Sequence, residues 1–148
     1  MVNYRVPLYL TVFILMIFYS ACSQQQENKF EIIGMDNDRV FIDYFKKLKQ
    51  AIKKGDSVFV SQHIDYPIQV DLGGPDHLTI DRKEDLFEHY SQIFDHDFKL
   101  AVLSQTLDSV HVNAQAIMLP RDMIIFKYEV DSQTDDEEIL IWRISHWY

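Results

Sequence analysis

The chain has 148 residues, enough for one domain of ordinary size, with a formal net charge of −9 and an aromatic content of 14%. This composition, with only four glycines and four prolines, is typical of a packed globular domain rather than a disordered chain. The acidic excess argues against binding to nucleic acid and against docking on anionic lipid through a polybasic surface. The single cysteine excludes an internal disulfide bond.

A hydrophobic leader opens the chain and carries one charged side chain, Arg5. Its uncharged run extends from Val6 to Phe18, and a helix of that length rises about 20 Å. The hydrocarbon core of a bilayer is roughly 30 Å thick, so the run is too short for a permanent membrane span. It predicts a signal peptide over residues 1–21.

The leader ends in Ser20-Ala21-Cys22, which resembles the lipobox of bacterial lipoproteins. In that motif small residues precede a cysteine that receives a diacylglycerol and becomes the new N-terminus. Tyr19 departs from the pattern, in which leucine is usual at this position. An ordinary secretory signal cut nearby and an uncleaved anchor remain as alternatives.

The resemblance implies lipid-mediated membrane attachment through Cys22, because several acyl chains on one cysteine hold a protein firmly. Residues 22–34 would then form the lipidated N-terminus and a polar, flexible spacer. Ser23 stands where inner-membrane retention signals place aspartate. Its presence implies a position in the cell envelope, on the outer membrane if the cell has one.

Helices are predicted first after the spacer. Residues 36–54 carry apolar side chains at helical spacing, and Gly55 suits the left-handed position that ends a helix. A second short helix follows over residues 57–63. Ile68, Val70 and Leu72 alternate as in a strand, a Gly-Gly-Pro-Asp turn follows, and Leu78 to Ile80 predicts the return strand.

The next helix is predicted to begin at Asp81, with Glu84 at capping-box spacing, and to bury Leu86, Phe87 and Tyr90. Residues 98–104 remain ambiguous between helix and strand. Val110 to Ala116 alternate as in one half-buried strand.

Two long strands are predicted at the C-terminus, over residues 123–130 and 139–148, separated by an acidic solvated loop. In the last strand Trp142 is expected on the same face as Ile144, and Arg143 and Trp147 on the other. Because both faces are apolar, the strand is either central and covered by helices or forms a homodimer or partner contact through the C-terminal sheet face.

Helices followed by strands predict an α+β domain over residues 35–148, with N-terminal helices packed on a curved antiparallel sheet. Four segments of it resemble nuclear transport factor 2-like (SnoaL-like) domains of small secreted bacterial proteins. They are residues 48–56, which contain Lys-Lys-Gly-Asp, residues 66–70, which begin Tyr-Pro, and residues 79–87 and 90–94. The resemblance implies a cone of curved sheet closed by helices, often with a pocket between them. Members include isomerases, hydrolases, dehydratases, ligand-binding proteins and immunity proteins.

No catalytic residue, metal site or cofactor is assigned from the sequence. The acid–base candidates by residue type are Asp65, Asp71, His89, Tyr90, His111 and Asp122. None of them has a spacing that pairs a carboxylate with a histidine. The six histidines are scattered, whereas a zinc site needs three or four converging ligands.

Tyrosines interrupt the apolar faces of the helices, and tyrosine suits a pocket wall that orients a ligand through one hydroxyl. The expected ligand-binding side chains are Tyr44, Tyr66, Tyr90 and Trp142. The sequence therefore predicts a membrane-tethered domain that binds a small molecule or an envelope protein without catalysis. An isomerase- or hydrolase-type enzyme in the same cone, and an immunity protein whose acidic surface meets a basic toxin, are the alternatives.

Overall fold

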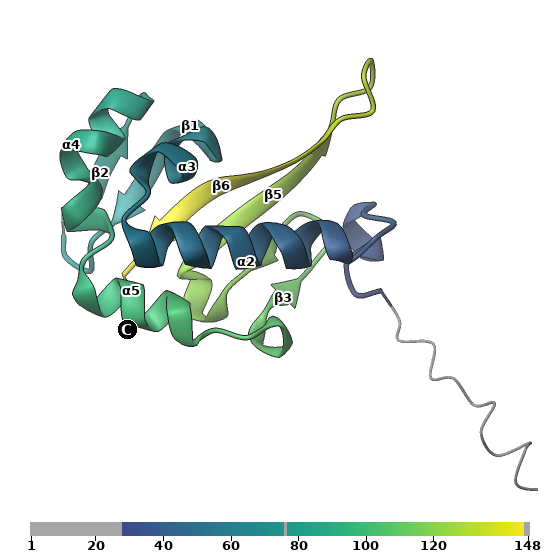
Figure 1. Ribbon diagram of the computed structural model, residues 1–148, viewed down its shortest axis with the longest axis horizontal. Coiled ribbons are helices and arrows are strands. Elements are labelled where there is room, and N and C mark those ends of the chain that lie inside the picture. The colour runs from purple at the N-terminus through teal and green to yellow at the C-terminus, as the bar shows by residue number, and fades with distance from the viewer. Residues whose placement is uncertain (1–27, 76, 147–148) are drawn as a thin grey trace, which may run out of the picture.

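A computed structural model of the protein describes residues 28–75 and 77–146, which form an α+β domain. In chain order its elements are η1 (Glu31–Ile33), α2 (Arg39–Lys54), α3 (Ser57–Gln62), β1 (Ile64–Asp71), β2 (His77–Ile80), α4 (Lys83–Ile93), α5 (His96–Ser104), η2 (Leu107–Ser109), β3 (His111–Val112), β4 (Ile117–Met118), η3 (Pro120–Asp122), β5 (Ile124–Val130) and β6 (Glu137–Ser145). The four α-helices lie against a single sheet, with α2 crossing β5 and β6 (Figure 1). The expected α+β class is confirmed.

The sheet has six strands in the order β2-β1-β6-β5-β4-β3. Its neighbouring strands pair antiparallel except for β1 and β6, which run parallel. The sheet is therefore mixed, and the expectation of an antiparallel sheet is wrong at this one pair. The reason is the chain path, because two α-helices and four strands lie between β1 and β6 in the chain, and β6 then enters the sheet beside β1.

The stripe of α2 that faces the sheet forms the centre of the core. Phe41, Leu48 and Ile52 are completely buried, and Phe45 is 3% exposed. Phe41 meets Phe126 of β5 edge to face, with ring centroids 5.6 Å apart. The helix ends at Gly55, whose φ of 73° is left-handed, as the sequence predicts.

The turn into α3 and the start of β1 follow from local chemistry. Asp56 caps α3 by accepting a hydrogen bond from Phe59 N at 3.0 Å. Pro67 lies in β1 where the pairing with β6 is interrupted between Ile64 and Gln69. A proline, which has no N–H to donate, is tolerated at such a break in the ladder.

α4 begins later than its predicted start, and one of its side chains faces the wrong way. The helix starts at Lys83, and its N-cap residue Arg82 makes no side-chain capping hydrogen bond, so the capping box at Asp81 is absent. Leu86 is completely buried, as expected, but Phe87 is 42% exposed. Only a narrow stripe of α4 is buried, and Leu86 belongs to it. Phe87 is the next residue, so its side chain is rotated about 100° around the helix axis, out of the buried stripe.

The region predicted as one strand over residues 110–116 is two short strands. β3 and β4 are joined by a turn in which Asn113 Oδ1 accepts hydrogen bonds from the backbone N–H groups of Gln115 and Ala116. Val110 and Ala116 are buried, but Ala114 between them is exposed, so the expected alternation is interrupted at the turn. An asparagine that bonds the backbone two and three residues ahead favours a turn over a continuous strand. The ambiguous residues 98–104 belong to α5.

A bulge changes the faces of the last strand. Ile125 pairs with Arg143, and Phe126 pairs with Ile141, so Trp142 is an extra residue on β6. Trp142 is consequently 52% exposed, whereas Ile144 is completely buried. The expectation that these two side chains share a face is wrong, because a bulge shifts the alternation by one residue.

The packed domain also extends into the stretch that the sequence assigns to the spacer. Phe30 is 2% exposed and lies 4.9 Å from the ring of Phe41. Asn28 fixes the turn before it, donating from Nδ2 to Met35 O at 2.8 Å. Residues 28–34, which the sequence assigns to the spacer, therefore belong to the packed part of the chain.

The two neighbours on α4 give a test of the fold. We predict that Leu86→Ala lowers the free energy of unfolding by about 2–5 kcal/mol, since it leaves a cavity in the core. Phe87→Ala should lower it by only about 1 kcal/mol, because much of that ring is already in water. Urea unfolding of both variants measures the difference, and equal losses would contradict this register of α4.

Candidate functional site

A cleft opens between α2, the end of α3 and β6. Its volume is about 320 Å³, at the lower end of the range for small-molecule sites. The residues that line it are Val40, Tyr44, Gln62, His63, Glu137, Glu138, Ile139 and Leu140. We call it the Tyr44 cleft.

The Tyr44 side chain forms the inner wall of the cleft. Its ring is held in place by Phe126, which it meets edge to face at 5.9 Å, and the residue is only 8% exposed. Its hydroxyl is buried and has no hydrogen-bond partner within residues 28–75 and 77–146. Burial raises the pKa of this hydroxyl far above its usual value, so Tyr44 is neutral and has a proton to donate.

His63 is the second polar group of the cleft. Its Nδ1 lies 2.8 Å from Phe59 O, which accepts a hydrogen bond from it. The imidazole stacks on the Phe59 ring at 4.3 Å and lies 5.3 Å from the Tyr44 ring. With the proton on Nδ1, the neutral ring presents Nε2 as an acceptor. Tyr44 and His63 thus place one donor and one acceptor beside the same cleft.

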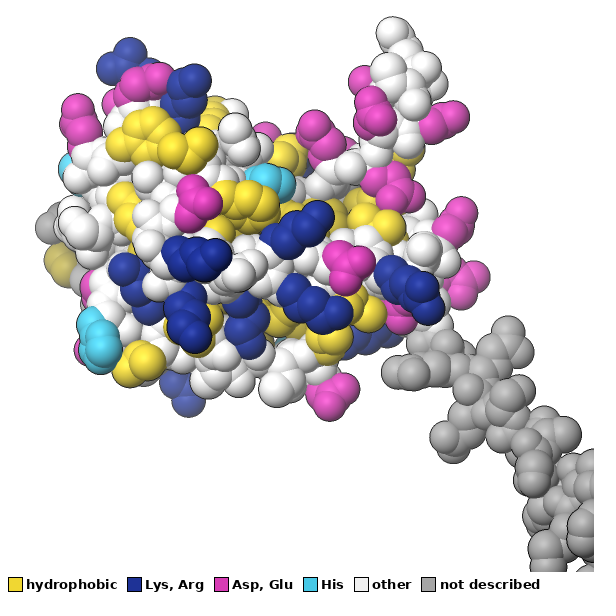
Figure 2. Space-filling model, viewed as in Figure 1, with side chains coloured by type: hydrophobic (Ala, Val, Ile, Leu, Met, Phe, Trp, Pro, Cys, Tyr) yellow, Lys and Arg dark blue, Asp and Glu magenta, His cyan; other side chains and the backbone are white. Residues whose placement is uncertain are grey.

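An adjoining hollow of about 520 Å³ shares three lining residues with the cleft, Val40, Tyr44 and His63. Its other lining residues are Asn37, Arg39, Asp43, Lys47 and Phe59. Two cations therefore lie on this side of Tyr44, whereas Glu137 and Glu138 lie on the other. Hydrophobic side chains are exposed between α2 and the strands behind it (Figure 2). Val40, Ile139 and Leu140 give the cleft an apolar part, and charged side chains of both signs lie around it.

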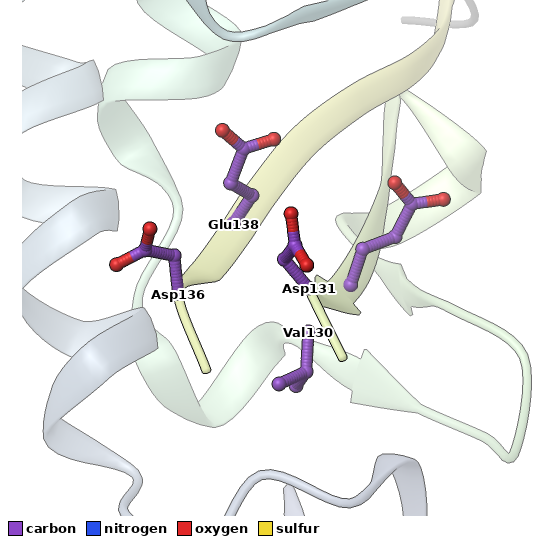
Figure 3. A pocket seen from close by; sticks show the side chains of 5 residues that line it. Val130, Asp131, Asp136 and Glu138 are labelled. Carbon is purple, nitrogen blue, oxygen red and sulfur yellow. The ribbon is translucent and has the colours of Figure 1, made fainter. Parts of the chain in front are cut away.

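A second cavity lies at the β5–β6 hairpin and is acidic. It measures about 520 Å³ and is lined by Val130 and four carboxylates, those of Glu129, Asp131, Asp136 and Glu138 (Figure 3). Asp131 Oδ1 already accepts a hydrogen bond from Gln133 N at 2.7 Å. Among the described residues, no group of three or more His, Cys, Asp or Glu side chains is arranged to hold a metal ion.

A third cavity, of about 320 Å³, contains Trp142. The other residues around it are Pro67, Gln69, Thr79, Ile125 and Arg143. It is formed by side chains of β1, β2, β5 and β6, and Trp142 lines neither the Tyr44 cleft nor the hollow beside it. The structure therefore does not bring Trp142 together with Tyr44.

Tyr66 and Tyr90, the two remaining predicted ligand-binding residues, line none of these cavities. The Tyr66 hydroxyl donates to Ser61 O at 3.1 Å, and burial raises its pKa to about 12. Burial also raises the pKa of Tyr90 to about 12. The Tyr90 hydroxyl has no hydrogen-bond partner among the described residues, and Lys99 Nζ lies 6.0 Å from the centre of its ring. Two buried tyrosine hydroxyls, those of Tyr44 and Tyr90, thus lack a hydrogen-bond partner among the described residues. Only Tyr44 also lines a cleft, so only Tyr44 marks a candidate site.

The acid–base candidates are scattered. Asp65 forms an ion pair with Lys127 at 2.6 Å, and buried Asp71 accepts a hydrogen bond from Gly73 N at 2.9 Å. Of the other candidates, His111 and Asp122 are exposed and His89 is half-buried. His146, by contrast, is buried and stacked on Phe98 at 4.4 Å, where its Nε2 lies 2.8 Å from Ile93 O.

Sequence reasoning missed His63, which was considered only as a possible metal ligand. The signal for it was weak, because His63 lies at the junction of a helix and a strand, where no periodicity assigns a face. Its position depends on Phe59, four residues earlier on α3, which holds the ring beside Tyr44. Within the described part of the chain, no carboxylate lies within 4.0 Å of its ring nitrogens.

No family model, curated protein or solved structure matches the chain. Within residues 28–75 and 77–146, no helix is long and apolar enough to cross a membrane. The leader and Cys22, on which the expected lipid tether depends, lie outside the described residues.

Two isosteric substitutions test the state of the tyrosine hydroxyls. We predict that Tyr44→Phe raises the free energy of unfolding by about 1 kcal/mol or more, because it removes a buried hydroxyl that has no partner. Tyr66→Phe should lower it by about 1 kcal/mol, since it deletes the hydrogen bond to Ser61 O. Urea unfolding decides the signs, and a destabilised Tyr44→Phe protein would show that this hydroxyl has a partner.

Proposed function

We propose that this protein is a lipid-tethered envelope protein whose domain binds a small molecule in the Tyr44 cleft without converting it chemically. One observation carries the proposal: Tyr44 lines a cleft of ligand size, and its buried hydroxyl has no hydrogen-bond partner among the described residues. A ligand acceptor that receives this hydrogen bond satisfies a group whose burial otherwise costs about 1–3 kcal/mol. The domain therefore gains stability when the cleft is filled.

The lining of the cleft defines the chemistry of its ligand. Val40, Ile139 and Leu140 offer apolar surface, Tyr44 offers one donor, and the Nε2 atom of His63 offers one acceptor. A mostly apolar molecule with a carbonyl or ether oxygen next to a donor group matches this set. The volume of about 320 Å³ limits the ligand to a compact molecule.

The contacts of His63 favour binding over catalysis. General acid–base catalysis needs a group whose pKa is tuned and whose orientation is fixed by a charged second group. His63 is instead oriented by a neutral backbone carbonyl, that of Phe59. Glu137 and Glu138 line the same cleft but make no ion pair with the imidazole.

The family proposed for the domain is the nuclear transport factor 2-like fold. Helices packed on one six-stranded sheet, with a cleft between α2 and β6, are compatible with its cone of curved sheet. The sequence segments that resemble the family map onto the end of α2, onto β1, and onto β2 with α4. The lipid tether is proposed from the Ser20-Ala21-Cys22 motif alone.

The acidic hairpin favours a second candidate function, capture of a basic protein such as a toxin. Six exposed carboxylates gather at the ends of β5 and β6 and in the loop between them, those of Glu129, Asp131, Asp135, Asp136, Glu137 and Glu138. Such a one-sign surface speeds the association of an oppositely charged partner. Exposed Trp142 offers a separate contact surface, on which we place the proposed homodimer or envelope partner.

Filling the Tyr44 cleft tests small-molecule binding. The probe is Nile red, a neutral, mostly apolar dye with a carbonyl acceptor. We predict fluorescence enhancement with the parent protein and a loss of affinity of about tenfold or more in Val40→Trp, because the larger side chain occupies the cleft. Val40 is only half-buried, so the domain tolerates the change. The matched control is Trp142→Ala; if it abolishes dye binding and Val40→Trp does not, the site lies on the sheet instead.

Removing the cysteine tests the tether. We predict that Cys22→Ser moves the protein from the membrane fraction to the soluble fraction and abolishes the mass increase that a diacylglycerol adds. Ser23→Ala, which keeps the cysteine, should leave both unchanged. Cell fractionation with intact-mass measurement reads the result, and a Cys22→Ser protein that stays in the membrane with the parent mass shift refutes lipidation.

A further inference from the structure

The outward face of α2 is strongly basic, although the chain as a whole is acidic. The helix carries one acidic side chain, Asp43, and six basic ones, Arg39, Lys46, Lys47, Lys49, Lys53 and Lys54. Five of the six basic side chains are exposed, and they lie opposite the buried stripe. Figure 2 shows the Lys and Arg side chains gathered over α2. We call this surface the basic face.

Most cations of the basic face have no competing carboxylate. Asp43 pairs with Lys46 at 3.5 Å, in an exposed i,i+3 contact of little energy. Lys49 donates to Gln105 O at 2.6 Å, which anchors it to the segment after α5. The other four cations, Arg39, Lys47, Lys53 and Lys54, form no ion pair with any described residue.

Apolar side chains flank the basic face on both sides. α3 and α5 both pack against α2. Val58 of α3 is 56% exposed and Leu100 of α5 is 55% exposed. Basic side chains bordered by exposed aliphatic ones are the chemistry of a surface that lies at a membrane interface, where cations meet headgroups and apolar groups enter the acyl boundary.

The largest group of acidic side chains lies apart from the basic face. The six carboxylates of the β5–β6 hairpin project from the body of the domain on the side away from α5 (Figures 1 and 2). An anionic surface attracts the basic face and repels this hairpin. The separation of charge therefore attracts the domain to an anionic surface and also orients it, with the basic face toward that surface and the hairpin away from it.

We propose that the basic face of α2 docks on the anionic headgroups of the membrane that holds the tether, an inference that rests on the lipid anchor proposed above. Five residues lie between Cys22 and Asn28, and the six Cα–Cα steps that join the two span at most about 21 Å. The described chain begins beside the N-terminal end of α2 (Figure 1). α2 itself is about 24 Å long, so it can lie flat on the surface within reach of the anchor.

The experiment uses the full chain, isolated in detergent from the membranes of expressing cells. It is reconstituted into nanodiscs of phosphatidylcholine alone or of phosphatidylcholine and phosphatidylglycerol in equal parts. Lysines are acetylated at low salt and read by mass spectrometry. We expect Lys47, Lys53 and Lys54 to react about fivefold or more slowly in the anionic discs, with the protection lost at high salt. Exposed Lys83 of α4 is the internal control and should react equally in both.

A paired variant, Lys47→Gln with Lys54→Gln, should reduce the protection that remains at Lys53, because two of the docking cations are gone. Equal labelling of the α2 lysines in both kinds of disc, in a chain that co-elutes with the discs, overturns the docking and leaves the tether intact. Protection that survives high salt or appears equally at Lys83 also overturns it. A chain that leaves the discs altogether overturns the tether, and the docking with it.

Discussion

The packing of α2 across β5 and β6 determines where the other features of the domain lie. Phe41 and Tyr44 meet Phe126 of β5 edge to face, and this contact fixes the rotation of the helix about its axis. With the rotation fixed, Tyr44 falls at the margin of the buried stripe, where it closes the cleft from inside. The same rotation turns the lysines outward, so one helix supplies core, cleft wall and basic face.

The sequence predicts α2 because its apolar side chains recur at helical spacing over the whole helix, and Gly55 suits the left-handed position that ends it. It predicts less well wherever a single backbone irregularity decides the outcome. The bulge at Trp142 moves that ring to the solvent side, and the run of apolar residues in this strand does not indicate that one residue is extra. Tyr44, one of the four residues that the sequence suggests for ligand binding, lines the cleft, whereas the position of His63 depends on how α3 and β1 meet. The parallel pairing of β1 with β6 depends likewise on chain path rather than on local pattern.

Charge is the property that composition describes least well. A formal net charge of −9 argues against an anionic partner only if the charges are mixed evenly over the surface. Here six cations share one helix, and six carboxylates share one hairpin. At physiological salt the electrostatic field of each charge is screened beyond about 8 Å. A partner surface therefore responds to the charges nearest to it and not to the net charge of the protein. The exclusion of polybasic docking, which rests on net charge, therefore does not apply to α2.

The energetics of Tyr44 distinguish a binding site from ordinary core. Phenylalanine would fill the same space, pack against Phe126 in the same way and avoid burying an unpaired hydroxyl, which costs about 1–3 kcal/mol. A residue that lowers stability at a cleft is explained when a ligand supplies the missing partner. Tyr90 carries a similar unpaired hydroxyl but adjoins none of the cavities described above, so the same argument assigns it no ligand. The coincidence of an unpaired donor, an acceptor on His63 and a cleft of ligand size makes this place the candidate site.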